Sequence, residues 1–236
     1  IDMVGVESDS RIILAEGVTK FFANMVRNRQ IPLSMNREKV LHQLTEINSK
    51  LMALKWSYLP LEQVLLSKDF RAVEIFAKEI FDSFPPNWEE TLGSRGTEGQ
   101  KLVGLLKFIR DFYYRLRERI STGFSEDLSD AMDIFCGEVL SIELISKGVW
   151  KCLVADGQAR YNVITAIEGV KKGEVVPIAK LPPQVVHGIY SEGMFMGSSE
   201  GLRRFTKEDI GKRPELTDKE LGQSRGILKQ QFLSQK

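Results

Sequence analysis

Few side chains in this 236-residue chain have the types and spacing that catalysis requires. Ser191 lies between Gly188 and Gly193, an arrangement similar to the glycine-flanked serine of a nucleophile elbow. However, the first glycine stands one residue too far from the serine, and the segment does not lead from a strand into a helix. The sequence therefore predicts no catalytic serine at this position.

The sequence also lacks the residue patterns of metal sites, of reactive thiol pairs and of phosphate-binding loops. The two histidines, His42 and His187, have no acidic or sulfur residue at metal-ligand spacing. Cys136 and Cys152 form no C-x-x-C pair, and we expect both to be small buried hydrophobic residues in a reducing compartment. The glycines of segment 93–101 miss the spacing of a phosphate loop. We therefore expect no enzyme activity, no cofactor and no metal site, and look for binding chemistry instead.

Composition limits the kinds of partner. The formal net charge is +1, with 33 Lys and Arg against 32 Asp and Glu, which excludes a polycation that coats nucleic acid by bulk charge. No run of 18 apolar residues is present, and the first residues lack the basic-then-apolar order of a signal peptide. We expect a cytoplasmic protein that does not bind a membrane, with enough residues for two domains.

The first half has helical periodicity. Apolar residues recur at steps of three and four within 11–29, 37–56, 70–81 and 98–120. Prolines fall between these stretches, where a missing N–H does least harm. Thr97 followed by Gln100 predicts a capping box at the start of the last helix. These patterns predict an all-helical domain over residues 1–125.

The last of these helices mixes arginines with aromatic residues from Lys107 onwards, as RNA-binding surfaces often do. A helical wheel places its apolar residues on one side and spreads its cations over the rest, interleaved with Asp111 and Glu118. This arrangement favours a solvated face on a packed core, with an i,i+4 pair between Asp111 and Arg115. RNA contact by this helix remains the alternative.

The second half has the short alternating runs of β-strands. β-Branched and other apolar residues gather at 163–165, 175–181 and 189–196, separated by glycine and proline turns. With two earlier strands, these would close into a five-stranded OB-fold β-barrel over residues 126–212, an architecture that binds nucleic acids. The predicted class is α+β: an N-terminal all-helical domain, the OB-fold barrel and a C-terminal helix.

The C-terminal extension, residues 213–236, has weak helical signals. Thr217 followed by Glu220 is a capping box, but Gly222 and Gly226 each cost about 1 kcal/mol relative to alanine in a helix interior. Such a helix needs a surface to lie on. That surface is either the chain's own barrel and helical domain or a dimer interface.

Several separated elements of the second half match a known family in order. Val163–Ala166 fits a V-[ST]-[GA] strand, Ala179–Pro183 fits A-x-L-x-P, and His187–Met194 fits R-G-x-x-S-x-[GA]-M. In these elements the chain resembles the tRNA-binding domain shared by the C-terminal domain of bacterial methionyl-tRNA synthetase, the endothelial monocyte-activating polypeptides and the chaperone-like protein CsaA. The match runs from Phe135 to Ser199 and leaves out the helical half.

The resemblance implies a non-catalytic, homodimeric protein that binds tRNA or another structured RNA by shape and phosphate contacts. An aminoacyl-tRNA synthetase is a further partner that it suggests. The family usually has a Lys and an Arg where this chain has Val185 and His187. Their replacement keeps open an alternative, a CsaA-like chaperone or peptide-binding module that accepts unfolded polypeptide.

An OB barrel usually binds through one sheet face and its flanking loops, with cations and stacking or apolar platforms. Matching positions and neighbouring charge give the candidate nucleic-acid-binding residues: Lys151, Arg160, Asn162, Lys180, His187, Ser191 and Met194. Ser191 is the leading candidate because its small hydroxyl occupies the serine position of the motif.

Overall fold

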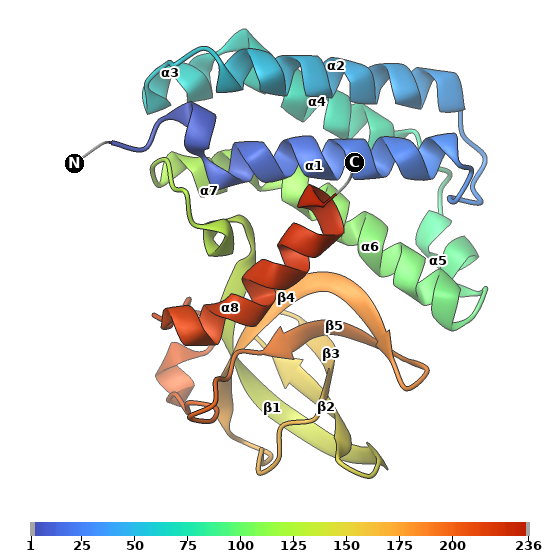
Figure 1. The fold of residues 1–236 in the computed structure, drawn as a ribbon. Coiled ribbons are helices and arrows are strands. Elements are labelled where there is room, and N and C mark those ends of the chain that lie inside the picture. The colour runs from blue at the N-terminus through green and yellow to red at the C-terminus, as the bar shows by residue number, and fades with distance from the viewer. Residues whose placement is uncertain (1–2, 235–236) are drawn as a thin grey trace.

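The computed structural model describes residues 3–234 and begins with a layered set of helices (Figure 1). The long helices are α1 (Ser10–Arg27), α2 (Arg37–Lys55), α4 (Lys68–Asp82) and α6 (Thr97–Tyr114). The shorter helices are η1 (Val6–Ser8) before α1, α3 (Leu61–Leu66) between α2 and α4, α5 (Trp88–Gly93) between α4 and α6, and α7 (Leu116–Ser121) after α6. The predicted apolar faces of the long helices are buried in one core, which confirms the all-helical first half.

Three local predictions in this half are wrong. The expected helix over 98–120 breaks at Arg115 (φ −100°, ψ 3°) into α6 and α7. Thr97 makes no capping box, because Gly96 is the N-cap and the Thr97 hydroxyl donates to the Gly188 carbonyl at 3.4 Å. The expected Asp111–Arg115 pair is replaced by an ion pair from Arg115 to Asp133 at 2.5 Å.

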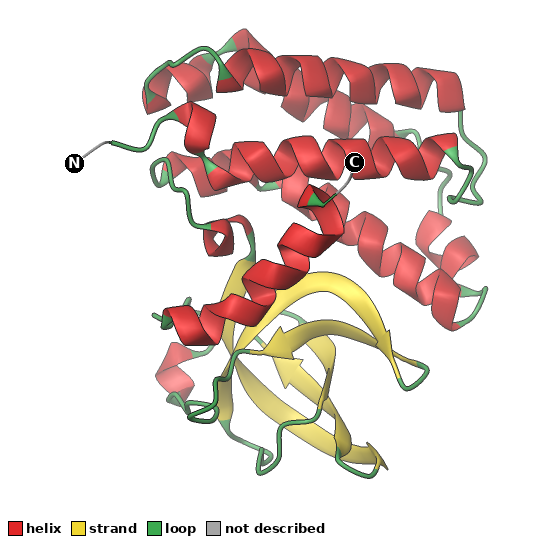
Figure 2. Ribbon diagram, viewed as in Figure 1, coloured by secondary structure: helices red, strands yellow, loops and turns green. Residues whose placement is uncertain are grey.

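The second half is a five-stranded antiparallel sheet (Figure 2). Its strands are β1 (Asp133–Ser146), β2 (Val149–Ala155), β3 (Arg160–Thr165), β4 (Val175–Val186) and β5 (Ile189–Phe195). The strand order is β3-β2-β1-β4-β5, and the two edge strands β3 and β5 lie against each other. The sheet therefore curls into a barrel of the expected OB type, which confirms the α+β class.

Side chains, rather than a backbone ladder, join β3 to β5. The Ile164 amide donates to Ser191 Oγ at 3.0 Å, and the Asn162 amide donates to Glu192 Oε2 at 2.7 Å. Within residues 3–234 no backbone ladder pairs these two strands. Ser191 and Glu192 thus satisfy β3 amides that a strand edge would otherwise leave without partners.

β1 and β4 have a hydrophobic core on each side. Phe135 and Ile178 lie in the barrel core, whereas Ile134 and Ala179 belong to the core shared with the helices. Because successive side chains of a strand point to opposite faces, both faces of these strands are covered. The helical half and the barrel are therefore packed together along β1 and β4.

The C-terminal helix lies on its own chain. Helix α8 (Asp218–Leu228) continues into a π-helical turn, η4 (Lys229–Leu233), and crosses the front of β4 in Figure 1. The Thr217–Glu220 capping box is confirmed. The buried Phe232 ring packs on Phe21 and Phe108, at centroid distances of 5.2 and 5.9 Å. These contacts confirm the first alternative, in which the C-terminal helix packs on the barrel and helical domain of its own chain.

Candidate nucleic-acid interface

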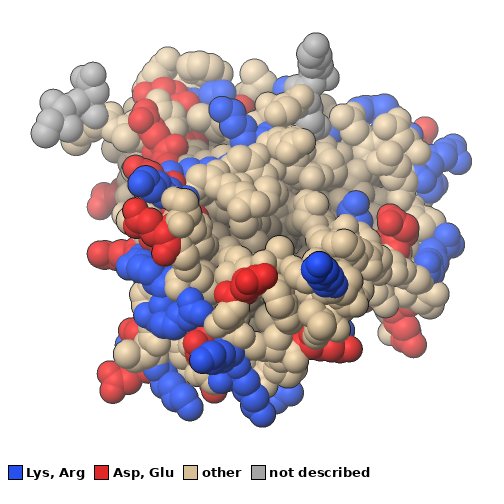
Figure 3. Space-filling view, turned by 60° about the horizontal axis from the view of Figure 1, so that its bottom comes forward, with Lys and Arg blue, Asp and Glu red and all other residues tan. Residues whose placement is uncertain are grey.

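The surface carries charges of both signs. Figure 3 shows Lys and Arg interspersed with Asp and Glu, around a broad uncharged area in the middle of that face. Most of the cations in the junction between the two halves have carboxylate partners. Binding of a polyanion would therefore depend on the local groups of cations that lack such partners.

Three of the predicted residues share the outer face of β2 and β3. In the strand register Lys151 is opposite Ile164, Leu153 is opposite Asn162, and Ala155 is opposite Arg160. Their neighbours along the strands point inward, into the barrel core: Cys152, Val154, Tyr161 and Val163. Lys151, Leu153, Arg160, Asn162 and Ile164 thus form one strip of outward-facing residues, which we call the β2–β3 strip. Lys151 and Arg160 lie at its two ends, about 13 Å apart along the strands at 3.3 Å per residue.

The strip also has acidic neighbours. Glu143 on β1 is the register partner of Lys151, and the Glu192 carboxylate lies at the Asn162 amide. Neither Lys151 nor Arg160 forms an ion pair within residues 3–234, and Arg160 is exposed. The strip can therefore contact phosphates at two points, with weaker attraction than a purely basic face would have.

Arg160 and Lys180 come together in a groove between α6 and the barrel, which we call the α6–barrel groove. Its volume is about 300 Å³. Helix α6 contributes Gly104, Lys107, Phe108 and Asp111, and the barrel contributes Ala159, Arg160, Tyr161, Lys180, Leu181, Pro183, Tyr190 and Glu192. Lys151 does not line this groove, so the predicted cations divide between two adjacent surfaces.

Lys180 has two close neighbours in the α6–barrel groove. Its Nζ lies 3.8 Å from Asp111 Oδ2 and 5.1 Å from the centroid of the Tyr161 ring. Burial, reinforced by the Asp156 carboxylate that accepts its hydroxyl, raises the pKa of Tyr161 to about 12. Tyr161 therefore stays neutral, and its ring and Lys180 form a cation–π pair at the mouth of the barrel.

A wider cleft of about 680 Å³ adjoins the α6–barrel groove and shares Asp111, Tyr161 and Lys180 with it. Its charged lining is mixed: Asp111, Arg115, Asp133, Asp156, Lys180, Lys212 and Arg213. Arg213 donates to the carbonyls of Ser129 and Met132. Because most of these groups are already engaged with one another, the cleft offers less free charge than its composition suggests.

The hairpin between β4 and β5 is packed against α6. His187 and Gly188 form its two-residue turn with φ values of 51° and 74°, the left-handed pair that a type I′ turn requires. A Cβ at Gly104 would lie 2.1 Å from Tyr190 Oη, so glycine at this position lets the end of the Tyr190 side chain pack against the helix. His187 is exposed at the tip of this hairpin.

Ser191 and Met194 lie on a third surface. Together with uncharged residues of α8 and η4 they line a groove of about 590 Å³: Ile164, Gln184, Val186, Ser191, Gly193, Met194, Gln223, Ile227, Gln230 and Gln231. Met194 is half-buried against the shared core, and Ser191 is 4% exposed. The Ser191 hydroxyl donates to the Gly193 carbonyl at 3.0 Å while it accepts from Ile164. The structure thus gives this hydroxyl a role in closing the barrel.

We expect Ser191→Ala to lower the free energy of unfolding by about 1–3 kcal/mol, because it leaves the buried Ile164 amide without a partner. Urea unfolding of the variant measures this difference. Ser199→Ala, at an exposed serine shortly after β5, is the control and should change stability by less than about 0.5 kcal/mol. Unchanged stability together with lost RNA affinity would instead make Ser191 a contact residue.

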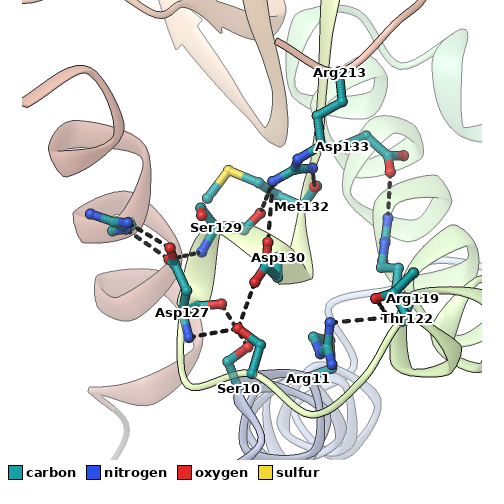
Figure 4. A network of polar contacts seen from close by, with 12 residues as sticks. Ser10, Arg11, Arg119, Thr122, Asp127, Ser129, Asp130, Met132, Asp133 and Arg213 are labelled. Atoms are coloured by element: carbon teal, nitrogen blue, oxygen red, sulfur yellow. Dashed lines mark hydrogen bonds and ion pairs between the residues drawn. The ribbon is translucent and has the colours of Figure 1, made fainter. Parts of the chain in front are cut away.

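A polar junction holds α6 and α7 on the barrel (Figure 4). Arg119 Nη2 donates to Asp133 Oδ1 at 3.0 Å, at the start of β1. Asp127, in the linker, accepts two hydrogen bonds from Arg225 of α8, at 2.9 and 2.7 Å. The junction therefore fixes the wall that α6 contributes to the groove, and it ties the C-terminal helix to the linker.

The sequence did not single out the groove residues Tyr161 and Tyr190, and RNA contact by the helix that carries Lys107 was only the alternative to a solvated face. One signal was available, since a glycine at position 104 inside a long helix costs about 1 kcal/mol and indicates a close approach of another segment.

The predicted burial of Cys136 and Cys152 is confirmed, and burial raises both thiol pKa values to about 11. Within residues 3–234 no three His, Cys, Asp or Glu side chains gather as a metal site would require.

None of the helices in residues 3–234 combines the length and apolar character needed to cross a bilayer. Among solved structures, the chain is similar to the crystal structure of a MetRS related protein from Pyrococcus horikoshii. The identity is 22%, the match covers 36% of this chain and 90% of that chain, and the TM-score is 0.32. That likeness is too distant to assign a function.

No curated protein sequence matches the chain. A family model described as "Alpha helical domain" matches residues 3–123, which span η1 to α7. Since these residues make up just over half of the 236, the chain belongs to the alpha helical domain family.

Proposed function

We propose that this protein is a non-catalytic RNA-binding protein whose OB-type barrel contacts a structured RNA through the β2–β3 strip and the adjoining groove. The observation that carries the proposal is a pair of cations on one outer face of the barrel, Lys151 and Arg160, which have no carboxylate partner among residues 3–234. The motif resemblance supports tRNA as the RNA. The near-neutral surface supports binding by a few phosphate contacts rather than by bulk charge.

Binding to unfractionated tRNA, measured as a function of salt concentration, tests this proposal. The affinity should fall linearly on a log–log plot, because each phosphate contact releases a counterion. The double variant Lys151→Ala, Arg160→Ala should make the slope shallower by about 1.4 to 1.8, which corresponds to two lost contacts.

Lys171→Ala, Lys172→Ala is the matched control. It removes the same charge from the exposed turn before β4, where both lysines also lack an ion pair within residues 3–234. Its slope should stay at the wild-type value. Absence of binding at about 50 mM salt, or an affinity independent of salt, would contradict the proposal.

The uncharged groove beneath α8 favours a second candidate, a peptide-binding or chaperone-like activity. Its lining combines four glutamines with an aliphatic floor and contains no charged residue. Amide side chains can both donate to and accept from a polypeptide backbone. An unfolded polypeptide bound there would be held with little dependence on salt, which distinguishes this activity from RNA binding.

A further inference from the structure

The α6–barrel groove contains polar groups that have no partner in the chain. The Arg160 side chain and the Tyr190 hydroxyl form no hydrogen bond or ion pair within the described residues, 3–234. Lys107 is held only loosely, with its Nζ 3.9 Å from Glu89 Oε2. Arg160 and the Tyr190 hydroxyl are therefore free to bind a ligand, and Lys107, on the opposite wall, can exchange its long contact with Glu89 for a contact with that ligand.

The acidic residues of the same groove are already occupied. Asp111 accepts from Arg110 at 3.3 Å and faces Lys180, and Glu192 accepts from the Asn162 amide. Burial, followed by the Glu192 charge, raises the pKa of Tyr190, so its phenol remains a neutral donor. A ligand with a negative group and a flat, hydrogen-bonding ring would satisfy the free groups without displacing these contacts.

The size of the groove restricts that ligand further. About 300 Å³ is at the lower limit of small-molecule sites, which suits one nucleotide and excludes a double helix. Single-stranded loops and ends supply such nucleotides, because their bases can be splayed out and stacked on aromatic side chains. Tyr190 is the aromatic wall, since the Tyr161 ring is occupied by Lys180 and the Phe108 ring by Phe232.

We propose that the α6–barrel groove binds one unpaired nucleotide of an RNA, with its phosphate between Lys107 and Arg160 and its base against Tyr190. The proposal rests on the RNA binding proposed above and makes the helical half part of the RNA site. It follows that the protein prefers RNA with a single-stranded segment to a blunt duplex.

Binding of a fluorescein-labelled oligouridylate of about ten nucleotides to the full chain tests this, with a blunt RNA duplex as the competitor. Lys107→Gln should make the salt dependence shallower by about 0.7, the value of one single-strand phosphate contact. Lys101→Gln is the matched control, because Lys101 is on the same helix but lines a different groove, beside Pro32. Its slope should equal that of the wild type.

A second variant, Tyr190→Phe, removes only the free hydroxyl and should weaken oligouridylate binding about 2- to 10-fold. Equal slopes for the Lys107 and Lys101 variants, or equal affinity for oligouridylate and duplex, would overturn the groove proposal. Salt-dependent tRNA binding would in that case leave the proposed function standing. If the wild type binds neither tRNA nor oligouridylate, the proposed function fails as well.

Discussion

Asp9→Ala is expected to lower the free energy of unfolding by about 3–5 kcal/mol, because it leaves a buried arginine without its counterion. Asp9 is 0% exposed and Arg11 is 1% exposed. The Asp9 carboxylate accepts from Arg11 Nε at 3.0 Å and Nη2 at 2.7 Å, and it also accepts from the Ser125 amide at 2.9 Å. The substitution therefore breaks the start of α1 and its link to the chain that leads into the barrel.

Urea unfolding at neutral pH measures this loss. The control is Asp82→Ala, which breaks an exposed pair with Lys78 that has the same N–O distance, 2.7 Å. Because solvent screens that pair, its loss should not be measurable. The double variant Asp9→Ala, Arg11→Met removes both charges and should recover part of the stability. A loss below about 1 kcal/mol for Asp9→Ala would mean that water reaches Arg11 in the folded protein.

The long helices and the strand pattern of this fold were predictable because periodicity is a local property. Val40, Leu44 and Leu51 repeat on one face of α2, and all are buried as expected. The break at Arg115 could not be predicted from periodicity. The buried residues Phe112 and Leu116 are four residues apart, so the helical spacing of apolar residues continues across the break. At the break the Arg115 side chain pairs with Asp133 at the start of β1 and with Glu118 of α7, and the pair with Asp133 depends on how the two halves pack. The six-residue helices α3 and α5 are too short for periodicity to reveal.

The site was predictable only in part. Strand alternation places Lys151, Asn162 and Arg160 on one face, and that follows from the sequence. Whether a strand residue faces the ligand or the seam between β3 and β5 depends on how the barrel closes, so Ser191 could not be placed. The groove wall depends on how α6 packs on the barrel, and Lys107 lies on a helical face that was assigned to solvent.

Asp133→Asn is expected to cost about 2–3 kcal/mol, because Asp133 is the carboxylate that compensates two arginines at the junction. Arg115 Nη1 and Arg119 Nη2 lie 2.5 and 3.0 Å from its Oδ1. The Arg119 side chain is 11% exposed, and its Nε and Nη1 are buried with no hydrogen-bond partner in the part of the chain that the structure describes. Loss of the charge would therefore remove the carboxylate that pairs with Arg119 and loosen α7 from the start of β1.

The stability that the Asp133 carboxylate contributes should decrease as the pH falls. Burial would raise the pKa of the Asp133 carboxyl, but the charges of Arg119 and Arg115 outweigh it and lower that pKa in the folded protein. The unfolded chain therefore takes up a proton first, at a pKa of about 3.9. Stability from Asp133 is complete well above that pH, and it is lost as the pH falls through the lower folded value.

The difference between wild type and Asp133→Asn in urea unfolding should accordingly be largest near pH 7 and shrink below about pH 4. Asp218→Asn is the control, because Asp218 also pairs with an arginine, at 2.9 Å, but is 92% exposed. It should cause no comparable loss at any pH. A difference for Asp133→Asn that stays constant down to about pH 3 would mean that the carboxylate acts through shape or neutral hydrogen bonds rather than through its charge. Because Asp133 holds α6 and α7 on the barrel, the same variant should also weaken oligouridylate binding at pH 7, where the groove wall loses its support.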